Sequence, residues 1–108
     1  MSTFTIKQGD TSPALEATLR DGSGLPIDLT DATVELRVRD EHGEVHINSS
    51  AFVEPEEDGV VVYEWKPEDT ARPGIFRGEW HVTFEDGSVE TFPNSGYLSI
   101  YVVDGIGV

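Results

Sequence analysis

The segment from Gly74 to Val103 constrains the fold more than any other part of the chain. Its first half alternates strictly between side chains suited to a core and side chains suited to water. One series is Phe76, Gly78, Trp80, Val82 and Phe84, and the other is Arg77, Glu79, His81, Thr83 and Glu85. Successive side chains of a strand point to opposite faces, so this pattern predicts a strand with one buried and one solvated face. Asp86-Gly87 then supplies the positive-φ positions of a tight hairpin.

The end of this segment repeats the alternation. Leu98, Ile100 and Val102 are predicted to face the core, while Tyr97 and Tyr101 share the opposite face with Ser99. Two interpretations of Tyr97 stay open: it is part of an exposed contact stripe, or it covers the edge of the core.

Shorter extended segments fill the rest of the chain. They lie at 4–6, 14–20, 33–39, 44–47, 51–54, 60–66 and 88–92, and Asn48-Ser49-Ser50 reads as a break. Pro67 to Ala71 predicts one helical turn. Turn residues every 8–12 positions or so, with no amphipathic helix, predict an all-β fold: an antiparallel immunoglobulin-like β-sandwich of about 7–9 short strands.

The predicted organisation is one domain over residues 1–108, with 103–108 as a flexible or docking tail. The expected large core side chains are Trp65, Phe76, Trp80 and Phe84. The chain has no cysteine, so disulfides and thiolate metal sites are excluded. The two terminal strands are expected to offer edges for β-augmentation.

The charge is strongly one-sided. Asp and Glu number 21 against 7 Lys plus Arg, for a net charge of −14, and Lys7 and Lys66 are the only lysines. Such a surface repels phosphates and anionic lipid, so neither nucleic acid nor membrane is an expected partner. Two interpretations remain: an ordinary acidic soluble protein, or adaptation to molar salt, where the Debye length falls to about 3 Å. The scarcity of lysine favours adaptation to salt.

No catalytic constellation stands out, and we expect neither enzyme activity nor a cofactor. His42 and His46 flank a turn, and His81 faces outward, so all three are interpreted as surface histidines rather than zinc ligands. The acidic run Glu54, Glu56, Glu57 and Asp58, and the loop acids Asp21, Asp28 and Asp31, lack the spacing of a calcium loop. They are interpreted as solvated turns, and no metal site is predicted.

Several short motifs follow one another in a distinctive order. They are Lys7-Gln8-Gly9-Asp10-Thr11, Asp21-Gly22, Pro26 to Ala32 running into Val34 to Val38, Asp58 to Trp65, Pro73 to Trp80, Phe84 to Gly87, and Thr91 to Tyr97. In this order the chain, from about Phe4 to Val103, resembles the immunoglobulin-like domain at the N-terminus of the upper baseplate protein of tailed phages, and related small tail or virion proteins.

The resemblance implies a structural role in a virus particle, made in the host cytoplasm and packed against copies of itself or other virion proteins. Many family members continue into host-binding extensions. This sequence ends at Val108, so a connector, decorating or adaptor role is expected.

The outward side of the long strand is mixed in charge on an otherwise acidic chain. With the outward side of the last strand it is the expected place for a neighbouring subunit. The expected interface residues are Arg77, Glu79, His81, Thr83, Tyr97 and Tyr101. The alternative function is a carbohydrate- or cell-surface-binding module that uses Tyr101.

Overall fold

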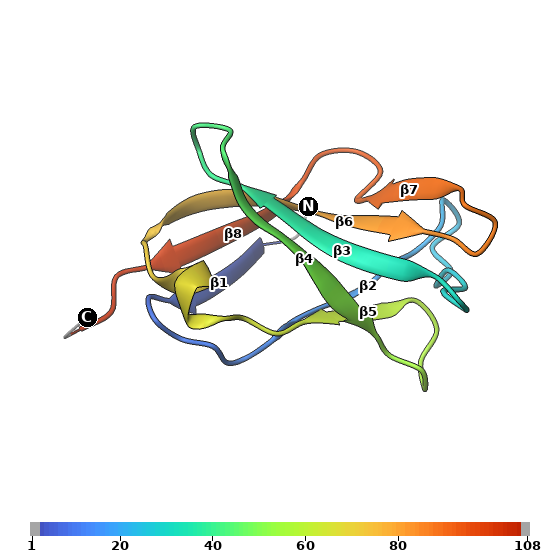
Figure 1. Ribbon diagram of the computed structural model, residues 1–108, viewed down its shortest axis with the longest axis horizontal. Coiled ribbons are helices and arrows are strands. Elements are labelled where there is room, and N and C mark those ends of the chain that lie inside the picture. The colour runs from blue at the N-terminus through green and yellow to red at the C-terminus, as the bar shows by residue number, and fades with distance from the viewer. Residues whose placement is uncertain (1–2, 107–108) are drawn as a thin grey trace.

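The computed structural model describes residues 3–106 and shows an all-β sandwich of immunoglobulin-like type (Figure 1). Its strands are Thr3–Lys7 (β1), Leu15–Thr18 (β2), Thr33–Arg39 (β3), Val45–Val53 (β4), Val60–Tyr63 (β5), Gly74–Thr83 (β6), Val89–Phe92 (β7) and Leu98–Val103 (β8). The predicted helical turn is a 3₁₀-helix, η1, at Pro67–Thr70. No helix within residues 3–106 has the length and apolar character needed to cross a bilayer. The predicted fold class is confirmed.

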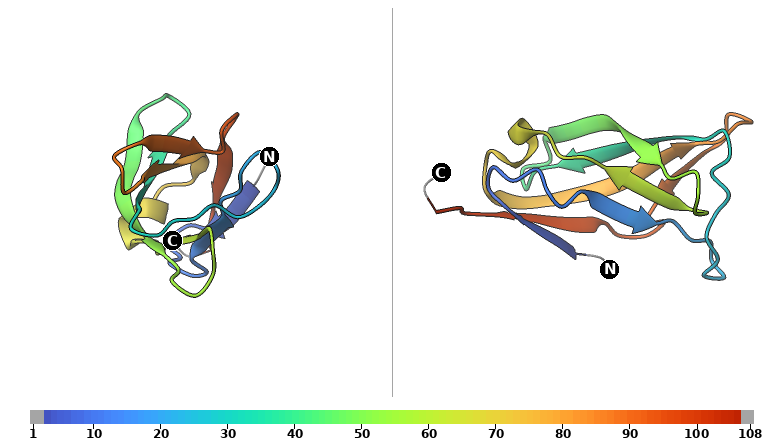
Figure 2. Two further views of the ribbon diagram at one scale, coloured as in Figure 1. Left: turned by 90° about the vertical axis from the view of Figure 1, so that its right-hand side faces the viewer. Right: turned by 90° about the horizontal axis from the view of Figure 1, so that it is seen from below.

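The strands follow the order β1-β8-β6-β3-β4-β5-β2, and β7 pairs with the C-terminal end of β6, from Trp80 to Thr83. Seen down the long axis, strands lie on both sides of the core (Figure 2). All pairings are antiparallel except β1 with β8, which is parallel. This arrangement places β8 between β1 and β6. The first strand is therefore an edge of the sheet, as predicted. The last strand was also predicted to be an edge, and that prediction was wrong.

The predicted tail at 103–108 is only partly described. Val103 belongs to β8, where it pairs with Lys7 of β1, so the last strand extends one residue into the predicted tail. Residues 107–108 of the prediction lie outside the described residues.

The core follows the predicted alternation. Phe76, Trp80 and Trp65 are almost fully buried, and Leu98, Ile100 and Val102 face the same interior. Phe84 is only partly buried because it lies just past the end of β6, where it packs against the margin of the core. The sequence interpretation missed Phe92, which is buried because its register partner on β6 is Trp80.

The predicted break at Asn48-Ser49-Ser50 was wrong. These residues lie in the middle of β4 and pair with Arg37, Leu36 and Glu35 of β3. Their backbone groups continue the β3–β4 ladder, so their low strand preference is overridden by the pairing. Further along, Phe52 and Val53 pair with β5 instead. A single long strand thus connects the two layers.

The hairpin after β6 also differs from the prediction. Phe84 donates its N–H to Ser88 O at 2.8 Å and Gly87 donates to Phe84 O at 2.9 Å, which closes a three-residue loop. Of Asp86 and Gly87, only Gly87 has a positive φ, at 88°. The β3–β4 hairpin closes in the same way around Asp40 and Gly43. Such loops place one glycine in the left-handed conformation next to the strand.

A buried polar cluster fixes η1 to the sandwich. The hydroxyl of Tyr63 donates to Asp69 Oδ2 at 2.6 Å, and the backbone N–H of Lys66 donates to the same oxygen at 2.9 Å. Thr70, fully buried, donates its hydroxyl to Asp10 O at 2.8 Å. His46 Nε2 donates to Asp69 O at 2.7 Å. We call these residues the η1 cluster.

Candidate interaction surface

The outer side of the β1–β8–β6–β3 sheet carries the residues that the sequence singled out. Strand register arranges this side in rows that run across the sheet. One row joins Arg39, Arg77, Ser99 and Thr3, because each is the register partner of the next. The next row joins Ile75 and Tyr101 to Thr5 of β1, and beyond it Val103 pairs with Lys7.

Together these rows contain no carboxylate. We define them as the acid-free face; its members are Thr3, Thr5, Lys7, Arg39, Ile75, Arg77, Ser99, Tyr101 and Val103. The face carries three of the 7 Lys and Arg residues of a chain whose net charge is −14. It also exposes apolar surface, since Ile75 is 52% exposed and Tyr101 36%. The face therefore combines cationic groups with exposed apolar groups on an acidic molecule.

The arginines of the face have no carboxylate partner in the described part of the fold. Arg39 and Arg77 are directly opposite one another on β3 and β6, and neither takes part in an ion pair within residues 3–106. Arg39 donates to Gly43 O at 3.2 Å, and the guanidinium of Arg77 lies 5.4 Å from the ring centroid of Tyr97. Like charges directly opposite one another across two strands are destabilising. The pair therefore contributes little to the fold itself.

A groove of about 680 Å³ adjoins the acid-free face. We call it the arginine groove. It lies between the β3–β4 hairpin and Tyr97, and its lining includes Arg37, Arg39, Arg77, Asp40, Glu41, His42, Asn48, Glu79 and Tyr97. Three arginines and three carboxylates, those of Asp40, Glu41 and Glu79, line the groove, so its cationic character depends on which of these groups are already paired.

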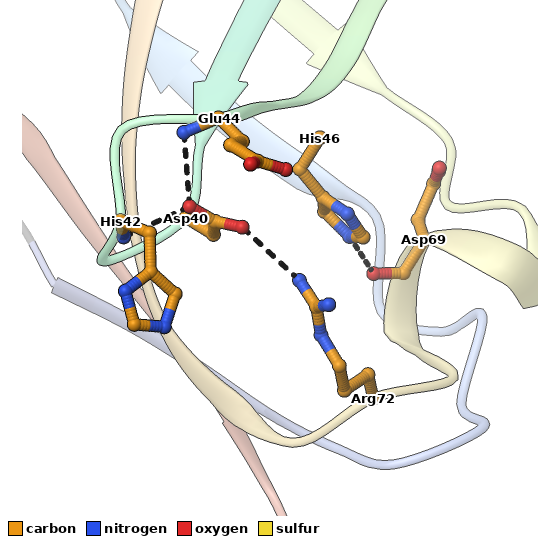
Figure 3. A network of polar contacts seen from close by, with 6 residues as sticks. All are labelled: Asp40, His42, Glu44, His46, Asp69 and Arg72. Carbon is orange, nitrogen blue, oxygen red and sulfur yellow. Dashed lines mark hydrogen bonds and ion pairs between the residues drawn. The ribbon is translucent and has the colours of Figure 1, made fainter.

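The carboxylate of Asp40 is occupied by its own hairpin, as Figure 3 shows. Its Oδ1 accepts the backbone N–H groups of His42 at 2.9 Å and Glu44 at 3.0 Å, and Arg72 lies 3.4 Å from its Oδ2. The N–H of Glu44, with that of His42, lowers the pKa of Asp40 below the ordinary 3.8.

The third arginine of the groove is also occupied. Arg37 pairs with Glu35 at 2.9 Å. Among the groove residues that the structure describes, the cations outside any ion pair are therefore Arg39 and Arg77, and the carboxylates outside any ion pair are Glu41 and Glu79.

The predicted interface residues divide into two groups. Arg77 and Tyr101 belong to the acid-free face, and Tyr97, 43% exposed, lies beside it under Arg77. This exposure favours the contact-stripe interpretation of Tyr97.

The second group, Glu79, His81 and Thr83, continues along β6 away from the face. There His81 is opposite Glu35 and Thr83 is opposite Val89. The sequence interpretation missed Lys7, Arg39, Ile75 and Val103. Only the register between distant strands could have revealed them.

The histidines make no metal site. Residues 3–106 contain no group of three or more His, Cys, Asp or Glu side chains placed to hold a metal ion. His42 is exposed, as predicted, and His81 is half-buried on the outer face. The prediction for His46 was wrong: it is partly buried, with its ring stacked on Phe76 at 4.6 Å between centroids. It lies at the shift in the β3–β4 register, between Val45, which is opposite Arg39, and Ile47, which is opposite Val38.

Comparison with known proteins supports the fold alone. No protein-family model matches the sequence, and no curated protein sequence matches it either. The fold is similar to that in the crystal structure of CopC from Methylosinus trichosporium OB3b, with a TM-score of 0.60 and 9% sequence identity. The alignment covers 100% of this chain and 90% of that chain. The likeness therefore extends over the whole sandwich, as expected for immunoglobulin-like folds that share architecture without sequence similarity.

Proposed function

We propose that this protein is a structural module of a tailed virus particle, in the tail, the baseplate or a head-associated position, and that it acts by protein–protein contacts. The observation that carries the proposal is the acid-free face. A chain with 21 acidic residues keeps part of one sheet surface, the rows that make up this face, without any, and places exposed Ile75 and Tyr101 there. The resemblance of the sequence to phage baseplate domains supports the same role. Other virion proteins and copies of this chain are the proposed partners.

A second part of the proposal concerns the host. A net charge of −14 with two lysines fits a virus of a halophilic host, since molar salt screens the repulsion between carboxylates. In low salt the same charge opposes the compact state.

Purified particles test the role directly. Mass spectrometry should detect this chain in density-purified virions, and antibody labelling in negative stain should place it at one position on the particle. Absence of the chain from such particles would contradict the proposal.

The alternative is a carbohydrate- or surface-binding module. The observation in its favour is the exposure of two tyrosines, Tyr97 at 43% and Tyr101 at 36%, since aromatic rings provide flat apolar surface with a polar tip. A glycan array probed with the wild-type protein and with Tyr101→Ala distinguishes this alternative from the virion role. Binding that the substitution abolishes supports the module, and no binding to any glycan counts against it.

A further inference from the structure

The strongest acidic feature of the molecule lies at the opposite end from the arginine groove. Strand β4 begins at Val45, beside Arg39, and ends at Val53, where the loop 54–59 leads into β5. Nine residues of strand span about 30 Å. In Figure 1 the β3–β4 hairpin and the β4–β5 loop project at opposite ends of β4. The two features therefore cannot meet within one molecule.

The β4–β5 loop is free to make contacts. Glu56, Glu57 and Asp58 are exposed, and within residues 3–106 no ion pair involves them. At the base of the loop Phe52 is 57% exposed. The loop thus combines carboxylates with an apolar side chain, which is the complement of the cationic and apolar acid-free face.

We propose that the β4–β5 loop of one copy docks in the arginine groove of a second copy, with Glu56 and Glu57 facing Arg39 and Arg77. This inference rests on the proposed function, because it names the partner of the acid-free face. Carboxylates placed beside the opposed arginines replace a like-charge contact with charge-assisted hydrogen bonds. Phe52 offers apolar surface toward Ile75 and Tyr101. The occupant of the groove is therefore another molecule of this chain.

The geometry of this contact is head to tail. Groove and loop are different surfaces of the same chain, so each copy can receive one neighbour and be received by another. Such heterologous contacts generate closed rings or open filaments, depending on whether the rotation between copies closes. Copies with a charge of −14 repel one another at long range, and salt shortens that repulsion to about 8 Å at 0.15 M. The contact is therefore tested at physiological ionic strength or above.

The test uses two charge-reversed variants of the whole chain. The groove variant carries Arg39→Glu and Arg77→Glu, and the loop variant carries Glu56→Arg and Glu57→Arg. A control with Arg20→Glu and Lys66→Glu changes the net charge as much as the groove variant does, at exposed positions off the face. Sedimentation velocity measures self-association of each protein, and of an equimolar mixture of the groove and loop variants.

We expect the wild type and the control to self-associate, and each reversed variant alone to associate at least about tenfold more weakly. The mixture should recover association to within about tenfold of the wild type. In the mixture the acidic loop of the groove variant meets the arginine groove of the loop variant, and the basic loop meets the acidic groove. Circular dichroism confirms that each variant is folded, and the recovery on mixing cannot arise from an unfolded chain.

Three results would overturn the proposal. They are a wild type that stays monomeric up to about 1 mM, reversed variants that associate as the wild type does, and a mixture no stronger than its separate components. The virion proposal fails differently, by absence of the chain from particles. A chain found in particles that does not self-associate would retain the virion role and lose this partner.

Discussion

Polar groups are buried and hydrogen-bonded in the η1 cluster, whereas the arginines of the acid-free face are exposed and have no carboxylate partner within residues 3–106. In the cluster Asp69 is 7% exposed, and its carboxylate and carbonyl accept hydrogen bonds from Tyr63, Lys66 and His46. Burial, and then the hydrogen bond to Asp69, raise the pKa of Tyr63 above its ordinary value, so the phenol remains a donor. On the face, Arg39 and Arg77 are exposed and oppose one another without a carboxylate. The cluster holds the fold together, whereas the face leaves its charges available to a partner.

The largest expected loss of stability comes from substitutions in the η1 cluster. Asp69→Ala removes the acceptor of two hydrogen bonds and leaves a buried hydroxyl unpaired, so the free energy of unfolding should fall by about 3 kcal/mol. Tyr63→Phe, which removes only the donor, should cost about 1 kcal/mol. Urea titration measures both. A loss below about 1 kcal/mol for Asp69→Ala would show that the cluster does not stabilise the fold.

Salt tests the acidic surface as a whole. The melting temperature should rise as KCl increases toward about 1 M, because screening relieves the repulsion among the carboxylates. KCl is preferred to sulfate, since sulfate stabilises proteins by exclusion from their surface whatever their charge. A variant with Glu56→Gln and Glu57→Gln provides the control and should show a shallower rise. A melting temperature that stays flat or falls would contradict the halophilic interpretation.

Tyr101 on the acid-free face should contribute to self-association and contribute little to the stability of the fold. Tyr101→Ala removes an exposed ring, so the free energy of unfolding should change by less than about 1 kcal/mol. Self-association should weaken because the apolar part of the contact is reduced. Val89→Ala, 54% exposed on β7 and outside the acid-free face, is the matched control. Equal effects of the two substitutions on association would argue against a role for the face.

The smallest effect concerns the hairpin beside the groove. Asp40 has a lowered pKa in the folded chain, so its stabilising contribution is present above the ordinary pKa of 3.8 and is lost as pH falls through the lowered value. Asp40→Ala should therefore be less stable than the wild type at neutral pH, and the difference should shrink between about pH 5 and pH 2. Asp58→Ala removes an equal charge from an exposed loop and serves as the control. A difference that is independent of pH would show that the turn does not depend on the ionised carboxylate.

The sequence predicted what depends on local periodicity. The inward series on β6 and the three apolar residues of β8 lie in the core because a strict two-residue alternation needs no knowledge of neighbours. Strand β4 was misread because polar residues at 48–50 favour a break, and only the ladder with β3 overrides them. His46 was misplaced for a different reason, because it lies at a register shift between β3 and β4 that periodicity along one strand does not reveal.

The candidate site was harder to predict than the fold. Arg77, Tyr97 and Tyr101 were identified from the outward positions of two adjacent segments. Lys7 and Arg39 are far away in the sequence, and they join the face only through the β1–β8 and β3–β6 registers. No pattern within a single segment contains that information, so the absence of carboxylates from these rows of the sheet becomes visible only in three dimensions.

The unfolding free energy and self-association of Arg77→Glu, compared with those of the equal-charge control Arg20→Glu, test whether the opposed arginines serve a partner and not the fold. The carboxylate introduced on β6 would lie opposite Arg39 and turn a repulsive pair into an attractive one. The free energy of unfolding should therefore gain up to about 1 kcal/mol. We predict that Arg77→Glu is at least as stable as the control in urea titration, while its self-association is weaker. An Arg77→Glu protein that is less stable than the control by more than about 1 kcal/mol, or one that associates as the wild type does, would contradict this interpretation of the face.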